Sequence, residues 1–158
     1  MSTHTLSLLV ENRHGALSRI ANLFSSRGYN ISSLAVAETE DPTVSRMTIV
    51  VAGDEEILEQ IVKQLNKLID VIKVIDFIDQ PIIERELLLV RVDTSKANRH
   101  EIIDLCDIYG GKIVSVSQKS VTVQLAGESG CLEDFISMVK PFGIREIVRS
   151  GAIAVAKS

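Results

Sequence analysis

Segments with strand and helix periodicity occur in the same order in both halves of the chain, and this repeat limits the fold more than any other feature. The strand-like runs of the first half lie at 5–10, 31–38, 45–51 and 71–78. The first helix pattern has apolar residues on one face at Leu17, Ile20, Ala21 and Phe24. The second follows the N-cap residue Asp54, with an apolar stripe at Ile57, Ile61, Leu65 and Leu68. The first half therefore predicts the order β-α-β-β-α-β.

The second half repeats this order. Its strand-like runs lie at 86–92, 112–117, 120–126 and 144–148, and the last can continue through Ile153 and Val155 after a break at Ser150-Gly151. Its helix patterns place apolar residues at Ile102, Cys106 and Tyr109, then at Leu132, Phe135, Ile136 and Val139. Asp79–Glu84 contains Pro81 and interrupts the apolar pattern, so we assign it as a linker. We predict an α+β protein of two ferredoxin-like βαββαβ domains, at 3–79 and 84–158.

Each predicted domain is small. The chain has 158 residues, 46% of them hydrophobic, so each domain contains only about 75 residues and buries little apolar area by itself. Two helices cover one face of a four-stranded sheet, which leaves the other face and the outer strands open. Pairing of edge strands or packing of helices between copies would cover them. We therefore expect a homodimer with twofold symmetry.

Charge and composition argue against several classes of protein. The chain has 17 basic and 21 acidic side chains, with four Phe, two Tyr and no Trp, which disfavours nucleic acid as a partner. No apolar run approaches the ~20 residues that a membrane span needs. The N-terminus lacks the residue order of a signal or transit peptide. We therefore predict a soluble, cytoplasmic protein that binds neither nucleic acid nor a membrane.

The sequence also lacks a recognisable catalytic or metal-binding motif. His4, His14 and His100 are far apart, and no CxxC pair occurs. Cys106 belongs to an apolar helix stripe, and Cys131 has no His or Asp placed by sequence to activate it. We predict no catalytic site, no metal site and no cofactor on this chain.

The stretch ENRHGALSRI, residues 11–20, joins the first strand to the first helix. The first turn of a helix has backbone N–H groups without intrahelical partners, and Gly15 would let a carboxylate approach them closely. Asn12 can either cap the helix or bind the polar ends of an amino acid. Asn30 follows the far end of the helix, so it could reach the same ligand only from a second chain. The pattern is compatible with an amino-acid site between two chains, and also with ordinary capping by Asn12 and a tight turn at Gly15.

Four segments resemble one known family, nearly from end to end of the chain. They are ENRHGALSRIANLFSSRGYNISSLAVAETEDPTVSRMTIVV, QLNKLIDVIKV, ERELLLVRV and PFGIREIVRSG. These segments look like the regulatory (small) subunit of acetolactate synthase, also called acetohydroxyacid synthase. The GYNI and DP-SRMTI elements distinguish this family from other proteins that carry the same amino-acid-binding module, the ACT domain.

The resemblance implies both a fold and a function. It implies an effector-binding and dimerising ACT domain at 3–79, followed by a second ferredoxin-like regulatory domain. It also implies a non-catalytic subunit that binds the large catalytic subunit, raises its activity and confers feedback inhibition by valine in branched-chain amino-acid biosynthesis. Thiamine diphosphate, Mg and FAD would belong to that catalytic partner. By position, the effector site would contain Asn12, Gly15, Ala16 and Leu17 of one chain and Asn30 and Ile31 of the other.

Some features leave alternatives open. Arg13-His14 stands where many relatives have an acidic or small residue, so the amino acid that is sensed can be valine, leucine or isoleucine. A stand-alone amino-acid-sensing ACT protein would carry the same site without an obligate enzyme partner. A small ferredoxin-like enzyme of the acylphosphatase kind would need a glycine-rich phosphate loop before a helix, and the sequence has none.

Overall fold

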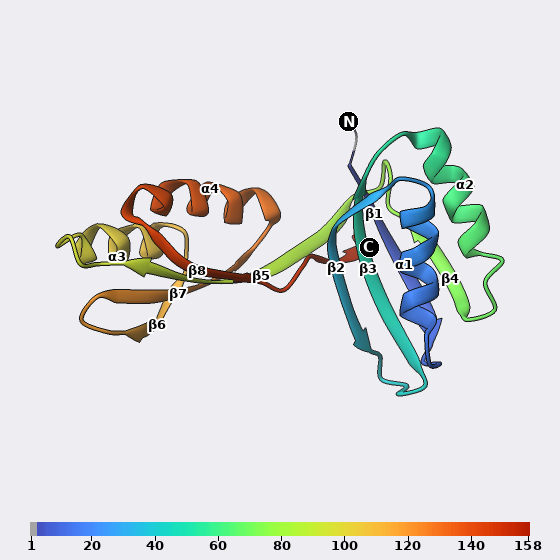
Figure 1. Cartoon of the computed structure of the whole chain (residues 1–158), viewed down its shortest axis with the longest axis horizontal. Coiled ribbons are helices and arrows are strands. Elements are labelled where there is room, and N and C mark those ends of the chain that lie inside the picture. The colour runs from blue at the N-terminus through green and yellow to red at the C-terminus, as the bar shows by residue number, and fades with distance from the viewer. Residues whose placement is uncertain (1–2) are drawn as a thin grey trace. The chain divides into compact units, whose positions relative to one another are not determined.

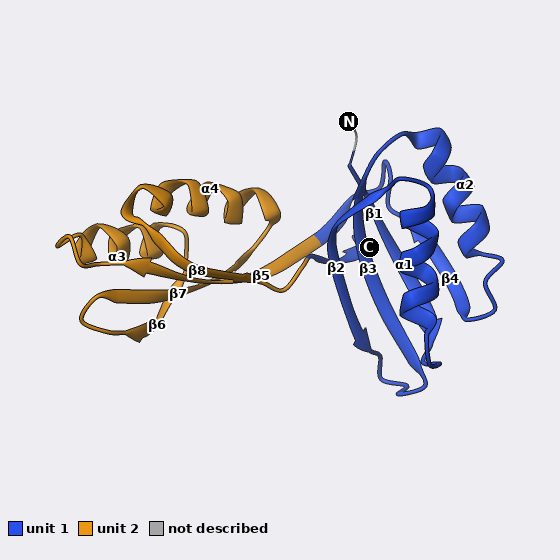
Figure 2. Ribbon diagram, viewed as in Figure 1, with its two compact units in different colours: residues 1–83, 152–158 blue, residues 84–151 orange. Residues whose placement is uncertain are grey.

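The chain forms two compact units in the computed structural model, which describes residues 3–158 (Figure 2). The first unit contains the chain up to Ile83 together with Ala152–Ser158, and the second contains Glu84–Gly151. The sequence places residues 152–158 in the second domain, whereas in the structure they lie with the first unit. Each unit has its own cluster of buried apolar side chains.

The first unit has the element order that the sequence predicts. Its elements are β1 (Thr3–Glu11), α1 (Ala16–Ser26), β2 (Asn30–Glu38), β3 (Val44–Ala52), α2 (Glu55–Leu65) and β4 (Val71–Asp76). The strands form an antiparallel sheet in the order β2-β3-β1-β4, with Leu8 of β1 opposite both Met47 of β3 and Val74 of β4. The helices α1 and α2 pack on one face of this sheet (Figure 1). This order makes β2 an edge strand.

In each of α1 and α2, one residue that was predicted on the buried face is exposed, and its neighbour in the sequence is buried instead. The side chains that α1 buries are Ala16, Ile20 and Phe24, and those that α2 buries are Leu58, Ile61 and Leu65. Leu17 and Ile57 were expected on these faces, but they are 46% and 37% exposed. In each helix the apolar residues span more than one face, so their spacing alone does not determine which face meets the sheet.

The second unit repeats the topology of the first. Its elements are β5 (Ile82–Asp93), α3 (Arg99–Ile108), β6 (Lys112–Val116), β7 (Ser120–Gly127), α4 (Ser129–Val139), a short 3₁₀ turn (Lys140–Phe142) and β8 (Ile144–Arg149). The sheet order is β6-β7-β5-β8. In its core, the rings of Tyr109 and Phe135 meet edge to face, with centroids 5.4 Å apart. The prediction of an α+β protein with two ferredoxin-like βαββαβ units is therefore confirmed.

The linker differs from the predicted pattern, whereas the predicted strand after the break at Ser150-Gly151 is present. The strand β5 begins at Ile82, inside the expected linker, and the last strand, β9 (Ile153–Ala156), pairs with it. Ala152 and Ala154 are buried, and the Ala152 N–H donates to Ser33 Oγ at 2.8 Å. The C-terminal strand therefore packs on the first unit through small side chains. These leave room for the backbone at Ala152 to approach Ser33 of β2 closely.

Candidate functional site

The loop between β1 and α1 leaves the head of α1 open. Gly15 occupies the N-cap position with a φ of +81°, and no side chain caps the helix. The Ala16 N–H donates to Arg13 O at 3.1 Å, but the N–H groups of Leu17 and Ser18 have no acceptor within the described part of the chain. Such amides, together with the positive end of the helix dipole, attract an anion.

Asn12 does not cap the helix, so the capping expected as one alternative is wrong, whereas the tight turn at Gly15 is present. Its Nδ2 donates to Pro42 O at 2.7 Å, and its Oδ1 accepts a hydrogen bond from Ser45 Oγ. These contacts hold the side chain against the turn that joins β2 to β3. A carbonyl oxygen has two lone pairs, so Asn12 Oδ1 can still accept one further hydrogen bond.

Glycine is favoured at position 15, at the head of α1, for two reasons. A φ of +81° is in the left-handed region, where a Cβ costs about 1–2 kcal/mol. A Cβ at this position would also lie 3.0 Å from Arg19 Nη1. Beside Gly15, Ala16 is buried while Leu17 stays half exposed, so the apolar side chain of Leu17 borders the open amides.

Two charged residues that were not predicted from the sequence, Arg19 and Asp70, lie at the head of α1. Arg19 donates to the Asp70 carboxylate, with Nε and Nη2 at 2.8 and 2.5 Å from Oδ2. Arg13 forms an ion pair with Glu11 at 2.6 Å and approaches Asp70 Oδ1 at 3.9 Å. Arg19 lies four residues after Gly15, on the next turn of the same helix, and this spacing could have indicated that Arg19 lies near the helix head. Asp70 is distant in sequence and carries no local signal.

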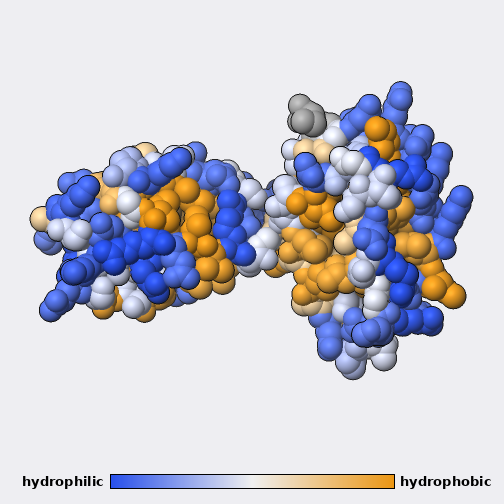
Figure 3. Space-filling model, in the orientation of Figure 1, coloured by the Kyte–Doolittle hydropathy of each residue, from blue (hydrophilic) through white to orange (hydrophobic). Residues whose placement is uncertain are grey.

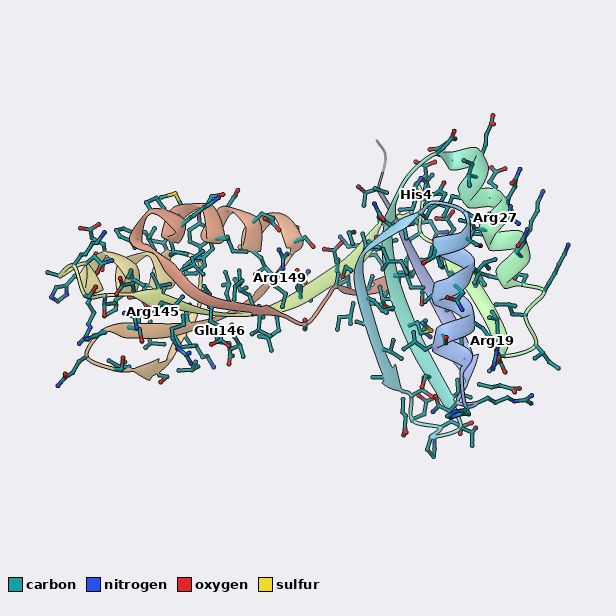
Figure 4. The ribbon with its side chains drawn as sticks, viewed as in Figure 1. His4, Arg19, Arg27, Arg145, Glu146 and Arg149 are labelled. Carbon is teal, nitrogen blue, oxygen red and sulfur yellow. The ribbon has the colours of Figure 1, made fainter. Side chains whose placement is uncertain are left out.

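Asn30 and Ile31 lie at the other end of the unit. Asn30 pairs with Ala52 at the end of β3, whereas Asn12 contacts Ser45 near its beginning. Seven residues of extended strand separate those two positions by about 24 Å. The structure therefore brings together Asn12, Gly15, Ala16 and Leu17 and separates them from Asn30 and Ile31 within one chain. Figure 4 shows the same separation along α1, with Arg19 near one end and Arg27 at the other.

Other reactive side chains show no comparable arrangement. No three described His, Cys, Asp or Glu residues come close enough together to hold a metal ion. Burial raises the pKa of the Cys106 thiol, and the nearby Asp107 raises it further, which disfavours the nucleophilic thiolate. Among the described helices, none has the length and apolar character needed to cross a membrane.

Two family models match the two parts of the chain. The family model "AHAS small subunit-like ACT domain" matches residues 6–73, and the model "Small subunit of acetolactate synthase" matches residues 85–158. The chain belongs to the acetolactate synthase small subunit family. The open loop and the first sheet therefore lie in an ACT domain.

Individual members of the acetolactate synthase small subunit family match along most of their length. The small subunit of Haemophilus influenzae is 52% identical over 153 residues, which cover 96% of this chain and 94% of that protein. The small subunit of Mycobacterium bovis is 46% identical over 155 residues, covering 98% and 92%. The crystal structure of the small subunit from Thermotoga maritima is 37% identical, with a TM-score of 0.90 and coverage of 100% and 99%. Sequence and fold therefore support the same assignment.

Proposed function

We propose that this chain is the regulatory subunit of an acetolactate synthase: it binds the large catalytic subunit, raises its activity and makes it sensitive to feedback inhibition by valine. The family assignment supports the partner, and the open head of α1 in the ACT domain supports the effector site. The condensation chemistry, with thiamine diphosphate, Mg and FAD, would belong to the catalytic subunit. The complex would act in the cytoplasm, in branched-chain amino-acid biosynthesis.

The observation that carries the proposal is the set of open amides beside Gly15. An amino acid has a carboxylate that these N–H groups can bind and an ammonium group that needs carbonyl oxygens. Asn12 Oδ1 provides one such oxygen, since it has a lone pair left after its bond from Ser45. A second oxygen would come from Asn30 of another copy, and Ile31 of that copy would contact the apolar side chain of the effector together with Leu17.

The position of β2 explains how a second copy could reach this head. Antiparallel pairing of two β2 strands about a twofold axis near Leu34 would place Asn30 of one copy opposite Glu38 of the other. Glu38 pairs with Ser45 in β3, and Ser45 donates to Asn12. Asn30 of the second copy would therefore reach the end of the sheet at which α1 begins.

The surface of β2 is suited to such a contact. It is an edge strand, so its outer N–H and C=O groups have no neighbouring strand in this sheet. Val36 on β2 is 43% exposed, and Figure 3 shows apolar side chains at the surface over this strand. An edge strand of nine residues with apolar residues at 34–37 is a favourable surface for a homodimer.

The effector site is tested by titration calorimetry with valine on the wild type, Asn12→Ala and Asn30→Ala, with Asn22→Ala on the exposed side of α1 as the control. Each of the first two variants should lose most of the binding, and the control should retain it. Mixing Asn12→Ala with Asn30→Ala should restore binding, because each mixed dimer contains one site with both asparagines. Absence of restoration would show that the two residues do not meet across a dimer.

The regulatory role is tested with the catalytic subunit of the same organism. Adding this chain should raise acetolactate formation, and valine should then inhibit the complex but not the catalytic subunit alone. A chain that binds valine yet neither co-purifies with the catalytic subunit nor changes its rate would instead be a stand-alone amino-acid sensor.

A further inference from the structure

The side chain of Arg19 turns back toward the beginning of its own helix. Its Nη2 contacts His14 O at 3.3 Å, and its Nη1 lies 3.0 Å from the position of a Cβ on Gly15. The guanidinium group is therefore beside the amides that would bind the effector carboxylate. Nη1 has no acceptor in the described part of the chain, so its two N–H groups remain available at the site.

Asp70 holds this guanidinium group in place. Oδ2 of Asp70 accepts from both Nε and Nη2 of Arg19, and Asp70 O accepts from the Glu11 N–H at 2.7 Å. The Asp70 side chain is 4% exposed, whereas the Arg19 side chain is 48% exposed. A buried carboxylate thus fixes an arginine whose free edge remains accessible to a ligand.

The second oxygen of Asp70 faces the other arginine at the head of α1. Asp70 Oδ1 is buried and has no hydrogen-bond partner in the described chain, and Arg13 Nε lies 3.9 Å away. This oxygen can only accept hydrogen bonds, so it does not contact a carboxylate ligand itself. Asp70 therefore holds the positive charge of both arginines at the head of α1, and the donor group that it leaves free is Arg19 Nη1.

We infer that Arg19 is a further ligand of the effector carboxylate and that Asp70 is its positioning residue. The inference rests on the effector site proposed above and adds a charged donor to the backbone amides. The carboxylate would accept hydrogen bonds from the amides after Gly15 and from Arg19 Nη1. Arg19 would therefore favour ligands with a carboxylate over ligands of equal shape that lack the charge.

The experiment compares L-valine with L-valinamide, which retains the side chain and the ammonium group but carries no carboxylate. Both ligands are measured by calorimetry, directly or in competition, on the wild type, Arg19→Gln, Arg19→Lys and Asp70→Asn. Arg91→Gln is the matched control, because Arg91 lies in the second unit, is 47% exposed and forms an ion pair with Glu146 at 2.9 Å. Melting curves show whether each variant remains folded.

Arg19→Gln should weaken valine binding at least tenfold and change valinamide binding less than about threefold, so that the preference for the carboxylate shrinks. Arg19→Lys should retain part of the preference. Asp70→Asn should reduce the preference without removing it, because Arg19 would remain but lose its fixed orientation. Arg91→Gln should leave both affinities unchanged.

The outcomes separate this inference from the proposed function. Wild-type protein that binds none of valine, leucine or isoleucine would overturn the effector site and Arg19's role with it. Valine binding that is unchanged in Arg19→Gln, or weakened equally with valinamide binding, would overturn the role of Arg19 alone. An unchanged preference in Asp70→Asn, even with a lower melting temperature, would show that Asp70 has only a structural role.

Discussion

The two units begin with the same strand, loop and helix, yet the loops differ in the residues that surround the helix head. In the first unit, Gly15 has a φ of +81° and α1 has no side-chain cap. In the second, the corresponding position of positive φ, +58°, is Ala97, and Asn98 follows it as the N-cap, again without a side-chain cap on the helix. The Asn98 side chain turns away from the helix instead, since its Nδ2 donates back to Asp93 O at 3.0 Å.

The basic residues of the two loops also differ. Arg19 turns back over the head of α1, whereas Arg99 on α3 donates to Ser117 O at 2.6 Å, in the turn between β6 and β7. The acidic residue of the second loop, Asp93, accepts hydrogen bonds from Ser95 and from Arg145. The repeated fold therefore supplies two uncapped helix heads, and only at the first does the arginine turn back toward the beginning of its own helix.

The largest expected effects distinguish the two cores. Phe24 and Phe135 are both completely buried, one in each unit, and replacing either with Ala should cost about 3–5 kcal/mol of unfolding free energy. If the units unfold separately, Phe24→Ala should destabilise only the first unit and Phe135→Ala only the second.

The two tyrosines allow the units to be followed one at a time. Tyr29 lies in the first core, Tyr109 packs on the second, and the chain has no tryptophan. Urea unfolding monitored by tyrosine fluorescence would report the first unit in a Tyr109→Phe background and the second in a Tyr29→Phe background. Equal shifts of both transitions in either Phe→Ala variant would mean that the units unfold together.

A reciprocal pair of substitutions tests the two loops. Gly15→Ala should destabilise the first unit by about 1–2 kcal/mol, because an alanine with positive φ is strained and its Cβ would meet the Arg19 side chain. Ala97→Gly should relieve the same kind of strain and stabilise the second unit by up to about 1 kcal/mol. Valine binding should be lost only in Gly15→Ala. A Gly15→Ala protein with unchanged affinity would show that close approach at Gly15 is unnecessary.

The C-terminal strand β9 pairs with β5 and lies with the first unit. Ser33→Ala removes the acceptor of the Ala152 N–H and should cost about 1 kcal/mol. Hydrogen exchange of the amides at 152–157 should accelerate, since the strand is then held less firmly. Ser32→Ala is the control, because Ser32 Oγ bonds to Val50 O instead. Equal acceleration in both variants would contradict a specific role of Ser33.

The smallest expected effect is on the stability of the two units at acidic pH. The Thr43 hydroxyl and N–H lower the pKa of Asp41 in the first unit, and the Ser95 N–H and hydroxyl lower that of Asp93 in the second. Each carboxylate therefore contributes stability above its ordinary pKa of 3.8, and this stability is lost as the pH falls through the lower pKa of the folded state.

Replacing one aspartate at a time should separate the two acid responses. Asp41→Asn should flatten the acid dependence of the first unit only, and Asp93→Asn that of the second only, in unfolding curves between pH 5 and about pH 2. An acid dependence of the first unit that is unchanged by Asp41→Asn would contradict the role of Thr43.

The sequence predicts the elements of both units well, because the alternation of strands and the spacing of helices are local properties. It also predicts Gly15 and the open amides, because a glycine at the start of an apolar helix pattern is a local signal. It does not predict the exposure of Leu17 and Ile57, since the apolar residues of each helix fit more than one face. Nor does it predict the partners of Asn12, which come from the turn after β2.

The sequence by itself thus determined the repeated βαββαβ order, the absence of known catalytic motifs and the family. Only the tertiary structure placed Asp70 beneath Arg19, fifty-one positions apart, and brought the C-terminal strand back to Ser33. The physical reason is the range of the interactions: periodicity acts over a few neighbouring residues, whereas ion pairs and strand packing depend on segments that become neighbours only when the chain has folded.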